Sequence, residues 1–255
     1  MRACVLTIGN EILKGKTVNT NAAEIGRLLY FSGYEVYRVL TVPDVKEEIG
    51  EGFRSLIGKC DVIVSSGGLG PTFDDMTVSS FAEEFKISLV LDEGVYNIIK
   101  SRADSRSHEM SKEREKMALI PKGSRIVENE LGSAPGIFHV VGNTKIYILP
   151  GVPAEMRSML KLIEEEIKLK DSFHFEESVL LKGVFEATLA PYITAIMKKY
   201  DGGVYIKSHP MLSKKGKSCL EVEVSAKSVQ LEKSRKLVKE VIMEIKTAAL
   251  KIGQG

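Results

Sequence analysis

The stretch that decides the fold of this chain is Ser65-Ser66-Gly67-Gly68-Leu69-Gly70-Pro71-Thr72-Phe73-Asp74-Asp75-Met76-Thr77. It begins where a short apolar run, 61–64, ends. It is followed by Val78, Phe81 and Phe85, which repeat at helical spacing. The pattern predicts a turn that joins a buried strand to a helix. In α/β proteins, such turns at the carboxyl ends of strands bind ligands.

The composition of the turn indicates which ligand it binds. Its glycines let the backbone approach a ligand closely, and amide groups near a helix N-terminus attract phosphate oxygens. Asp74 and Asp75 would repel the same anion. A divalent cation between carboxylates and phosphates removes this conflict, and oxygen ligands favour magnesium or manganese. The alternative is that the two aspartates only cap the helix.

The composition of the whole chain excludes several classes of protein. Its 255 residues are 44% hydrophobic and carry a formal net charge of +2, which is too balanced to predict a nucleic-acid surface. No apolar stretch approaches the roughly twenty residues that span a bilayer, and no signal peptide opens the chain. A cytoplasmic protein without a membrane partner is expected. Cys4, Cys60 and Cys219 are predicted to be buried free thiols, with neither a disulfide framework nor a zinc site.

The order of predicted elements defines the fold class. The first two-thirds of the chain alternates strands with helices, which predicts an α/β domain whose mainly parallel sheet has helices on both faces. Segments 136–141 and 145–149 flank Gly142-Asn143, a hairpin signal, and a helix begins at Pro153. The rest of the chain predicts a small βαββα domain, with strands at 178–184, 203–208 and 219–226 and helices at 189–200 and 231–250.

Polar side chains follow several of the predicted strands. Glu11 follows the first, Asp44 the second, and Asp74 and Asp75 the third, so all of them are expected at one edge of the sheet. Asp44 is equally suited to be the N-cap of the next helix. Asn21 belongs to Asn19-Thr20-Asn21, where a cap with a spare amide and a ligand contact are both compatible with the sequence. The chain has no Walker lysine motif, dinucleotide-binding fingerprint or serine elbow.

Several ordered motifs together resemble the CinA family, the competence/damage-inducible proteins, over roughly residues 1–170. The amino-terminal part of these proteins is a molybdopterin-binding-like domain related to MoaB and MogA. The matching segments are Gly9-Asn10-Glu11-Ile12-Leu13, Gly15, Asn19-Thr20-Asn21, Ser66 to Thr77, Asn129, Gly132, Ala134-Pro135-Gly136 and Leu149-Pro150-Gly151-Val152-Pro153-Ala154-Glu155-Met156.

The resemblance implies a three-layer α/β/α sandwich with a mostly parallel mixed sheet, and a site lined by turns. Asp44 and Asp75 look like the two acidic positions that mark this site, with Asp74 beside them. The positions assigned to substrate binding are Asn21, Gly67, Gly68, Leu69, Gly70, Thr72, Asn129, Gly132, Pro150, Gly151 and Glu155. The resemblance further implies metal-dependent hydrolysis of ADP-ribose or a related dinucleotide pyrophosphate, and a homodimer or homotrimer.

The chain departs from the family in two places. Many members have aspartate where this chain has Asn10, which makes Glu11 the more important acid there. The chain ends at Gly255, so no deamidase domain and no deamidase activity are expected. Residues 175–255 resemble the KH-like domain of the family but lack the GxxG loop that clamps RNA. The basic run 207–217 is therefore assigned to a dimer contact or to a hairpin at the edge of the substrate site.

The leading hypothesis is a hydrolase that cleaves a pyrophosphate bond with the help of magnesium, manganese or cobalt. Glu11, Asp44, Asp74 and Asp75 would hold one or two metal ions, and the amides of residues 67–70 would bind phosphate oxygens. The rival is a protein of cofactor biosynthesis that binds or adenylates molybdopterin through the same turn. A non-catalytic nucleotide-binding protein is the third possibility.

Overall fold

The computed structural model describes residues 1–105, 107–212 and 218–253. The chain divides into two compact units. The first comprises Met1–Tyr30 and Tyr34–Lys168, and the second comprises Phe31–Gly33 and Leu169–Gly255. Within the described ranges, no helix is both long enough and apolar enough to cross a membrane.

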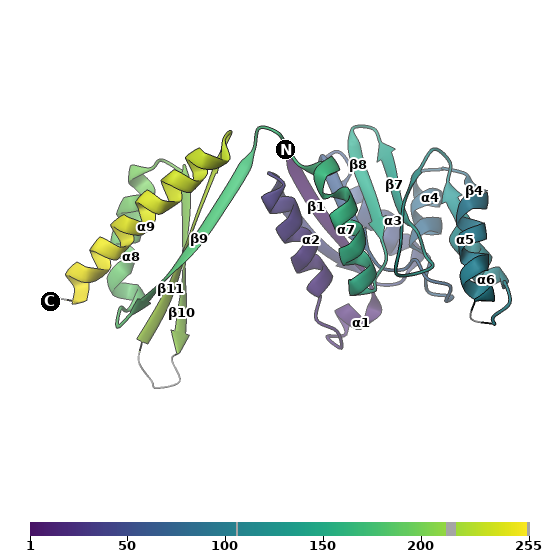
Figure 1. Ribbon diagram of the computed structural model, residues 1–255, viewed down its shortest axis with the longest axis horizontal. Coiled ribbons are helices and arrows are strands. Elements are labelled where there is room, and N and C mark those ends of the chain that lie inside the picture. The colour runs from purple at the N-terminus through teal and green to yellow at the C-terminus, as the bar shows by residue number, and fades with distance from the viewer. Residues whose placement is uncertain (106, 213–217, 254–255) are drawn as a thin grey trace. The chain divides into compact units, whose positions relative to one another are not determined.

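The first unit alternates strands and helices and then adds an antiparallel hairpin (Figure 1). Its elements are β1 (Arg2–Ile8), α1 (Asn10–Leu13), α2 (Thr20–Phe31), β2 (Glu35–Val42), α3 (Lys46–Leu56), β3 (Val62–Ser66), α4 (Thr77–Glu84), β4 (Leu89–Leu91), α5 (Glu93–Asp104), α6 (Lys112–Glu115), η1 (Lys116–Ala118, a 3-10 turn), β5 (Leu119–Pro121), β6 (Arg125–Val127), β7 (Gly136–Val141), β8 (Thr144–Leu149) and α7 (Pro153–Ile167).

Six strands form the central sheet, in the order β2-β1-β3-β8-β7-β6. The first four are parallel, and β7 and β6 are antiparallel to their neighbours. The predicted hairpin across Gly142-Asn143 is confirmed as β7 and β8. The fold is therefore the expected mostly parallel mixed sheet, and the carboxyl ends of β1, β3 and β8 meet at one edge.

Helices cover both faces of this sheet because alternate residues of its strands are apolar on each side. On one face, Leu6 packs in a core with Phe53 of α3 and Phe81 of α4, whose rings contact edge to face with centroids 5.1 Å apart. Figure 1 shows α2 and α7 on the opposite face, where Ile25 and Met159 are fully buried. The helices packed on both faces therefore hold the sheet, and with it the edge where the turns lie, in place.

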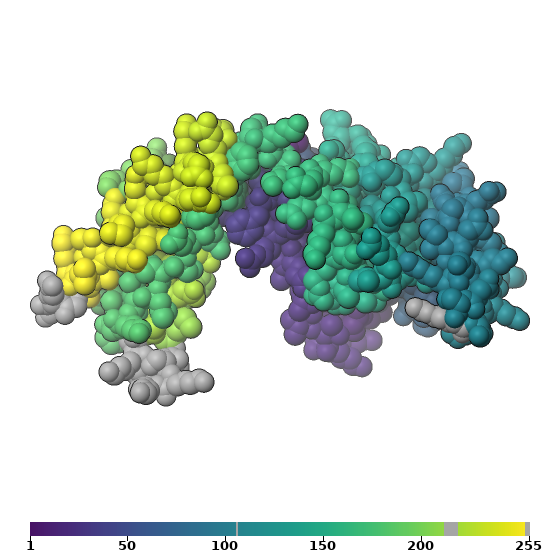
Figure 2. All heavy atoms as spheres, in the orientation of Figure 1, coloured from purple at the N-terminus to yellow at the C-terminus, as the bar shows by residue number. Residues whose placement is uncertain are grey.

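The second unit has the predicted βαββα order. It comprises β9 (Phe173–Lys182), α8 (Glu186–Lys199), β10 (Val204–Leu212), β11 (Ser218–Ser228) and α9 (Leu231–Gly253). Its three strands form an antiparallel sheet in the order β10-β11-β9. Alternate residues of β11, such as Val222 and Val224, pack in a core with residues of α8 and α9, and Figure 2 shows α9 in yellow along this unit. Residues 213–217 of the basic run 207–217 lie outside the described residues.

The prediction for the cysteines is wrong in one respect. Cys4 and Cys60 are buried as expected, but they form a disulfide. Cys4 pairs in register with Ile63 of β3, so the turn before β3 lies beside β1. The two Cα atoms are 6.0 Å apart, a separation that a disulfide spans. Cys219 is a free thiol.

The disulfide predicts a difference in thiol counts. In denaturant without a reductant, maleimide should modify one cysteine per chain, Cys219, because the other two sulfurs are bonded to each other. After reduction it should modify three. Intact-mass spectrometry measures both counts, and three modifications without the reductant would show that Cys4 and Cys60 are free in the protein.

Candidate functional site

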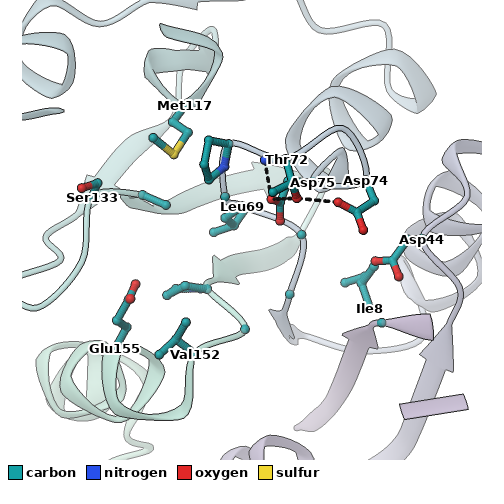
Figure 3. A pocket seen from close by; sticks show the side chains of 18 of the residues that line it. Ile8, Asp44, Leu69, Thr72, Asp74, Asp75, Met117, Ser133, Val152 and Glu155 are labelled. Atoms are coloured by element: carbon teal, nitrogen blue, oxygen red, sulfur yellow. Dashed lines mark hydrogen bonds between the residues drawn. The ribbon is translucent and has the colours of Figure 1, made fainter. Parts of the chain in front are cut away.

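A pocket of about 540 Å³ opens where the carboxyl ends of β1, β3 and β8 meet (Figure 3). Turns that follow the three strands form its floor and part of its walls, as the sequence predicts for a sheet of this class. The residues that line it are Ile8, Gly9, Glu11, Asp44, Gly67, Gly68, Leu69, Gly70, Pro71, Thr72, Asp74, Asp75, Arg114, Met117, Ser133, Ala134, Pro150, Gly151, Val152 and Glu155.

The turn after β3 can be made only with glycine at two positions. Gly67 and Gly68 have φ values of 120° and 68°, where side chains are strained. A Cβ on Gly67 would lie 2.2 Å from the carbonyl oxygen of Ile8, and one on Gly68 would lie 2.2 Å from Oγ1 of Thr77. Thr77, the first residue of α4, donates from Oγ1 to the Gly67 carbonyl oxygen at 2.8 Å. The glycines therefore let the turn pack against both β1 and α4.

The amide groups of this turn are only partly available to a ligand. The Gly67 N–H donates to the carbonyl oxygen of Leu149 at 3.0 Å, so the expectation that it binds phosphate is corrected. The N–H groups of Gly68, Leu69 and Gly70 donate to no other residue in the part of the chain that the structure describes. The turn thus presents three consecutive amides, an arrangement that binds anions.

Asp74 and Asp75 shape the end of the turn and do not cap α4. The residue before α4 is Met76, and no side chain caps the helix. Oδ2 of Asp75 accepts from the backbone N–H of Thr72 at 2.9 Å, and Oγ1 of Thr72 lies 2.5 Å from oxygens of both aspartates. Lys116 donates to the carbonyl oxygens of Thr72 and Asp75. The helix-cap alternative is therefore wrong, and both carboxylates face the pocket (Figure 3).

The surroundings of Asp74 lower the pKa of its carboxyl group. The hydrogen bond from the Thr72 hydroxyl is the largest cause, followed by a backbone hydrogen bond and then by the positive charge of Lys116. Each of these stabilises the ionised form. Asp74 therefore becomes protonated at a lower pH than an ordinary aspartate does.

Asp44 and Glu11 line the same pocket from the turns after β2 and β1. Oδ2 of Asp44 accepts from the backbone N–H of Asn10 at 2.7 Å, which ties the two turns together. Val45, and not Asp44, is the N-cap of α3, so the capping alternative is wrong here too. Glu11 folds over Gly9, whose Cβ, if present, would lie 2.6 Å from Oε1 of Glu11.

The four predicted metal ligands line one pocket, but they are spread around it. Among residues 1–105, 107–212 and 218–253, no three histidine, cysteine, aspartate or glutamate side chains form a group that could hold a metal ion. The donors fit a magnesium-type ion in another way, because such ions are commonly held by one or two carboxylates together with substrate phosphates. Asp74 and Asp75 are adjacent carboxylates in this lining, since both accept from the hydroxyl of Thr72.

Three other predicted site residues lie outside the pocket lining and act on residues within it. Asn21 is 9% exposed, and its Nδ2 donates to Ser66 Oγ and to the Gly151 carbonyl oxygen, both at 2.8 Å. Asn129 donates to Oε2 of Glu155 at 2.8 Å and accepts from the N–H of Gly132. Pro150 and Gly151 are in the lining itself. Asn21, Asn129 and Gly132 therefore support the turns that form the pocket.

Sequence reasoning did not assign Arg114, Met117, Ser133 or Val152 to the site. Arg114 is the one basic side chain among the described lining residues, and it lies in α6, in a charged part of the chain. No motif marks it. Ser133 lies between glycines in a loop that the sequence singled out, but a serine in such a loop carries no distinctive signal.

The comparisons with known proteins agree with this geometry. Residues 4–168 match the model of a family described as "Probable molybdopterin binding domain". The chain belongs to this family. It is 44% identical over 252 residues to a protein of Caldivirga maquilingensis, covering 99% of this chain and 98% of that protein. It is also 44% identical over 247 residues to a protein of Thermoplasma volcanium, covering 97% and 95%.

One solved structure extends the comparison. The crystal structure of the protein CinA, of unknown function, from Thermoplasma acidophilum has a TM-score of 0.62 and 48% sequence identity. It covers 65% of this chain and 97% of that chain. This chain is thus similar to a CinA protein over 65% of its length, in agreement with the resemblance drawn from the motifs.

The first prediction from the site concerns Gly67. Gly67→Ala should destabilise the protein by about 1–3 kcal/mol, because the new methyl group meets the Ile8 carbonyl oxygen at a positive φ. Gly26→Ala is the matched control, since space around Gly26 in α2 is open and alanine favours a helix. Urea unfolding measures both variants. Equal stability of the Gly67 variant and the wild type would contradict the close packing of this turn.

The second prediction concerns the ionisation of Asp74. Thr72→Val should raise the pKa of Asp74, because it removes the hydroxyl that stabilises the carboxylate. Thr72→Ser, which keeps the hydroxyl, should leave that pKa near its wild-type value. An NMR titration that follows the Asp74 carboxyl carbon gives the midpoint in each protein. The assignment of the hydroxyl as the main cause fails if valine leaves the midpoint unchanged.

Proposed function

We propose that this pocket binds a nucleoside diphosphate sugar and hydrolyses its pyrophosphate bond with the help of a divalent metal ion, with ADP-ribose as the first substrate to test. The proposal depends on one observation: Gly68, Leu69 and Gly70, whose amides are not used within the described part of the chain, line the same pocket as Asp74 and Asp75, and a Cβ on Gly70 would lie 2.6 Å from Oδ2 of Asp75. Amides bind phosphate oxygens and carboxylates bind cations, so together they suit a metal-bound diphosphate.

The charges of the lining support a ligand that arrives with a cation. Five carboxylate residues line the pocket, whereas Arg114 is the one basic side chain among its described residues. A diphosphate alone would be repelled by these carboxylates. Asp74 and Asp75, with Asp44 or Glu11, would hold the ion, which when bound would neutralise the phosphates and lower the pKa of a water molecule.

The residues of the chain would position the reacting bond. The amides of residues 68–70 donate to phosphate oxygens and stabilise negative charge as it increases during the reaction. Because this turn is fixed by Thr77 and Ile8, its amides need little rearrangement. A water oxygen forms a bond to one phosphorus atom while the bond from that phosphorus to the bridging oxygen breaks. The products are AMP and ribose 5-phosphate, and the protons pass to solvent.

The central prediction is a metal-dependent release of AMP from ADP-ribose. Purified protein should form AMP with magnesium, manganese or cobalt and form none with a chelator. Asp75→Asn should lower kcat/KM at least about 100-fold, because it removes a charged metal ligand but keeps an oxygen that can accept from Thr72. Chromatography of the products measures the rate.

Asp104→Asn is the matched control, because Asp104 is exposed and does not line the pocket. It should retain the wild-type rate. Comparable unfolding temperatures of the two variants would exclude a folding defect as the cause of any loss. If wild-type protein forms no AMP with any of the three metals, or if Asp75→Asn is fully active, the hydrolase proposal is wrong.

A second candidate function is favoured by the family match, which describes a molybdopterin-binding domain. Molybdopterin carries a phosphate that the same three amides would bind. Protein purified from cells that make the cofactor, then oxidised, should release a fluorescent pterin if this function is correct. Gly67→Ala should lose the pterin, because it distorts the turn. Pterin retention without AMP formation would favour this candidate over the hydrolase.

A further inference from the structure

The pocket has two chemically different ends. Figure 3 shows Asp44, Asp74 and Asp75 on one side, Glu155 and Ser133 on the other, and Leu69 of the glycine turn between them. All of these residues line the pocket. A ligand whose phosphates lie on the turn and whose cation lies at the three aspartates therefore directs its remaining part toward Glu155. That part must supply hydrogen-bond donors, since Glu155 is an acceptor when ionised.

Glu155 is held in place before any ligand arrives. It lies in the first turn of α7, and its Oε2 accepts from Nδ2 of Asn129 at 2.8 Å. Asn129 is itself fixed, because Nδ2 also donates to the Ala134 carbonyl oxygen at 2.7 Å and Oδ1 accepts from the N–H of Gly132 at 2.8 Å. The loop and the carboxylate thus form one rigid assembly.

Gly132 allows this arrangement by lacking a side chain. A Cβ at this position would lie 2.1 Å from Oε2 of Glu155, so the carboxylate packs directly on the backbone of the loop. The second oxygen, Oε1, accepts from no residue among those that the structure describes. Glu155 therefore presents to the pocket a fixed oxygen with unused acceptor capacity.

The parts of a nucleotide differ in how well they match such an acceptor. The vicinal hydroxyls of a ribose supply two adjacent donors, and carboxylates bind ribose hydroxyls in dinucleotide sites in this way. The edge of adenine that carries its amino group has a hydrogen-bond donor next to a nitrogen that is an acceptor. The lone pair of that nitrogen would be repelled by the carboxylate. The hydroxyl of Ser133, which both donates and accepts, suits a further sugar oxygen.

We propose that Glu155 determines substrate specificity by accepting hydrogen bonds from the vicinal hydroxyls of the terminal ribose of a nucleoside diphosphate ribose. The inference rests on the proposed hydrolase function and names the part of the substrate that is recognised. It assigns Asn129 and Gly132 as positioning residues, which act through Glu155. A nucleoside diphosphate without the second sugar should bind less tightly, since it leaves Glu155 without a partner.

The test compares two ligands that cannot be hydrolysed, the α,β-methylene analogues of ADP-ribose and of ADP, with magnesium present. Calorimetry should show tighter binding of the ADP-ribose analogue to the wild-type protein. Glu155→Gln should weaken that binding at least about 10-fold, because hydrogen bonds to a charged acceptor are the strong ones. It should change binding of the ADP analogue by less than about twofold. Glu165→Gln, an exposed change on the same helix, should alter neither.

Each outcome separates this inference from the function on which it rests. Wild-type hydrolysis of ADP-ribose with unchanged binding by Glu155→Gln would overturn the inference alone. Equal weakening of both analogues would also overturn it, because Glu155 would then contact a part that both analogues contain, such as the ribose next to adenine, or act on the pocket as a whole. A wild-type protein that neither binds the analogues nor forms AMP would overturn the proposed function as well. An unchanged unfolding temperature of Glu155→Gln excludes a folding defect.

Discussion

The packing of Gly67 against the carbonyl oxygen of Ile8 is the constraint on which the site depends. No side chain fits there, because a Cβ would lie 2.2 Å from that oxygen. The same residue also approaches the turn after β8, since a Cβ on Gly151 would lie 3.3 Å from the Cα atom of Gly67. Three strand ends are therefore brought together by backbone contacts, and the side chains that follow these strands are placed around a common space.

The polar groups around this space hold the turns in place and also supply charge to the pocket. Asp75 orders the turn through Thr72, and Asp44 ties the turn after β1 to the end of β2. Both also expose charge to the pocket. Lys116 donates to two carbonyl oxygens of the same loop, and its positive charge offsets part of the charge of Asp74. Charged residues thus maintain the shape of the site, and variants that remove them require a stability measurement alongside any measurement of function.

Local patterns in the sequence did not predict β4, α5, β5 and β6, but they were sufficient for the alternation of strands and helices from β1 to α4, the turn after β3, the hairpin of β7 and β8, and the βαββα unit. Each of these depends on residues close together in the chain. Contacts between distant residues were not predictable in this way: Asn129 meets Glu155 across 26 positions, and Asn21 meets Gly151 across 130. Arg114 lines the pocket but belongs to a charged segment, and the composition of that segment resembles that of segments exposed to solvent.

The bond between Cys4 and Cys60 has a consequence for the unfolded chain. It closes a ring across a sequence separation of 56 residues, which contains α2, β2 and α3. In the chain-entropy model, a ring of this size reduces the entropy of the unfolded chain and so raises its free energy, relative to the folded state, by about 4 kcal/mol. The bond also keeps the central strands β1 and β3 tethered in the unfolded chain. Refolding therefore starts with these two strands, which pair in the sheet, already close together.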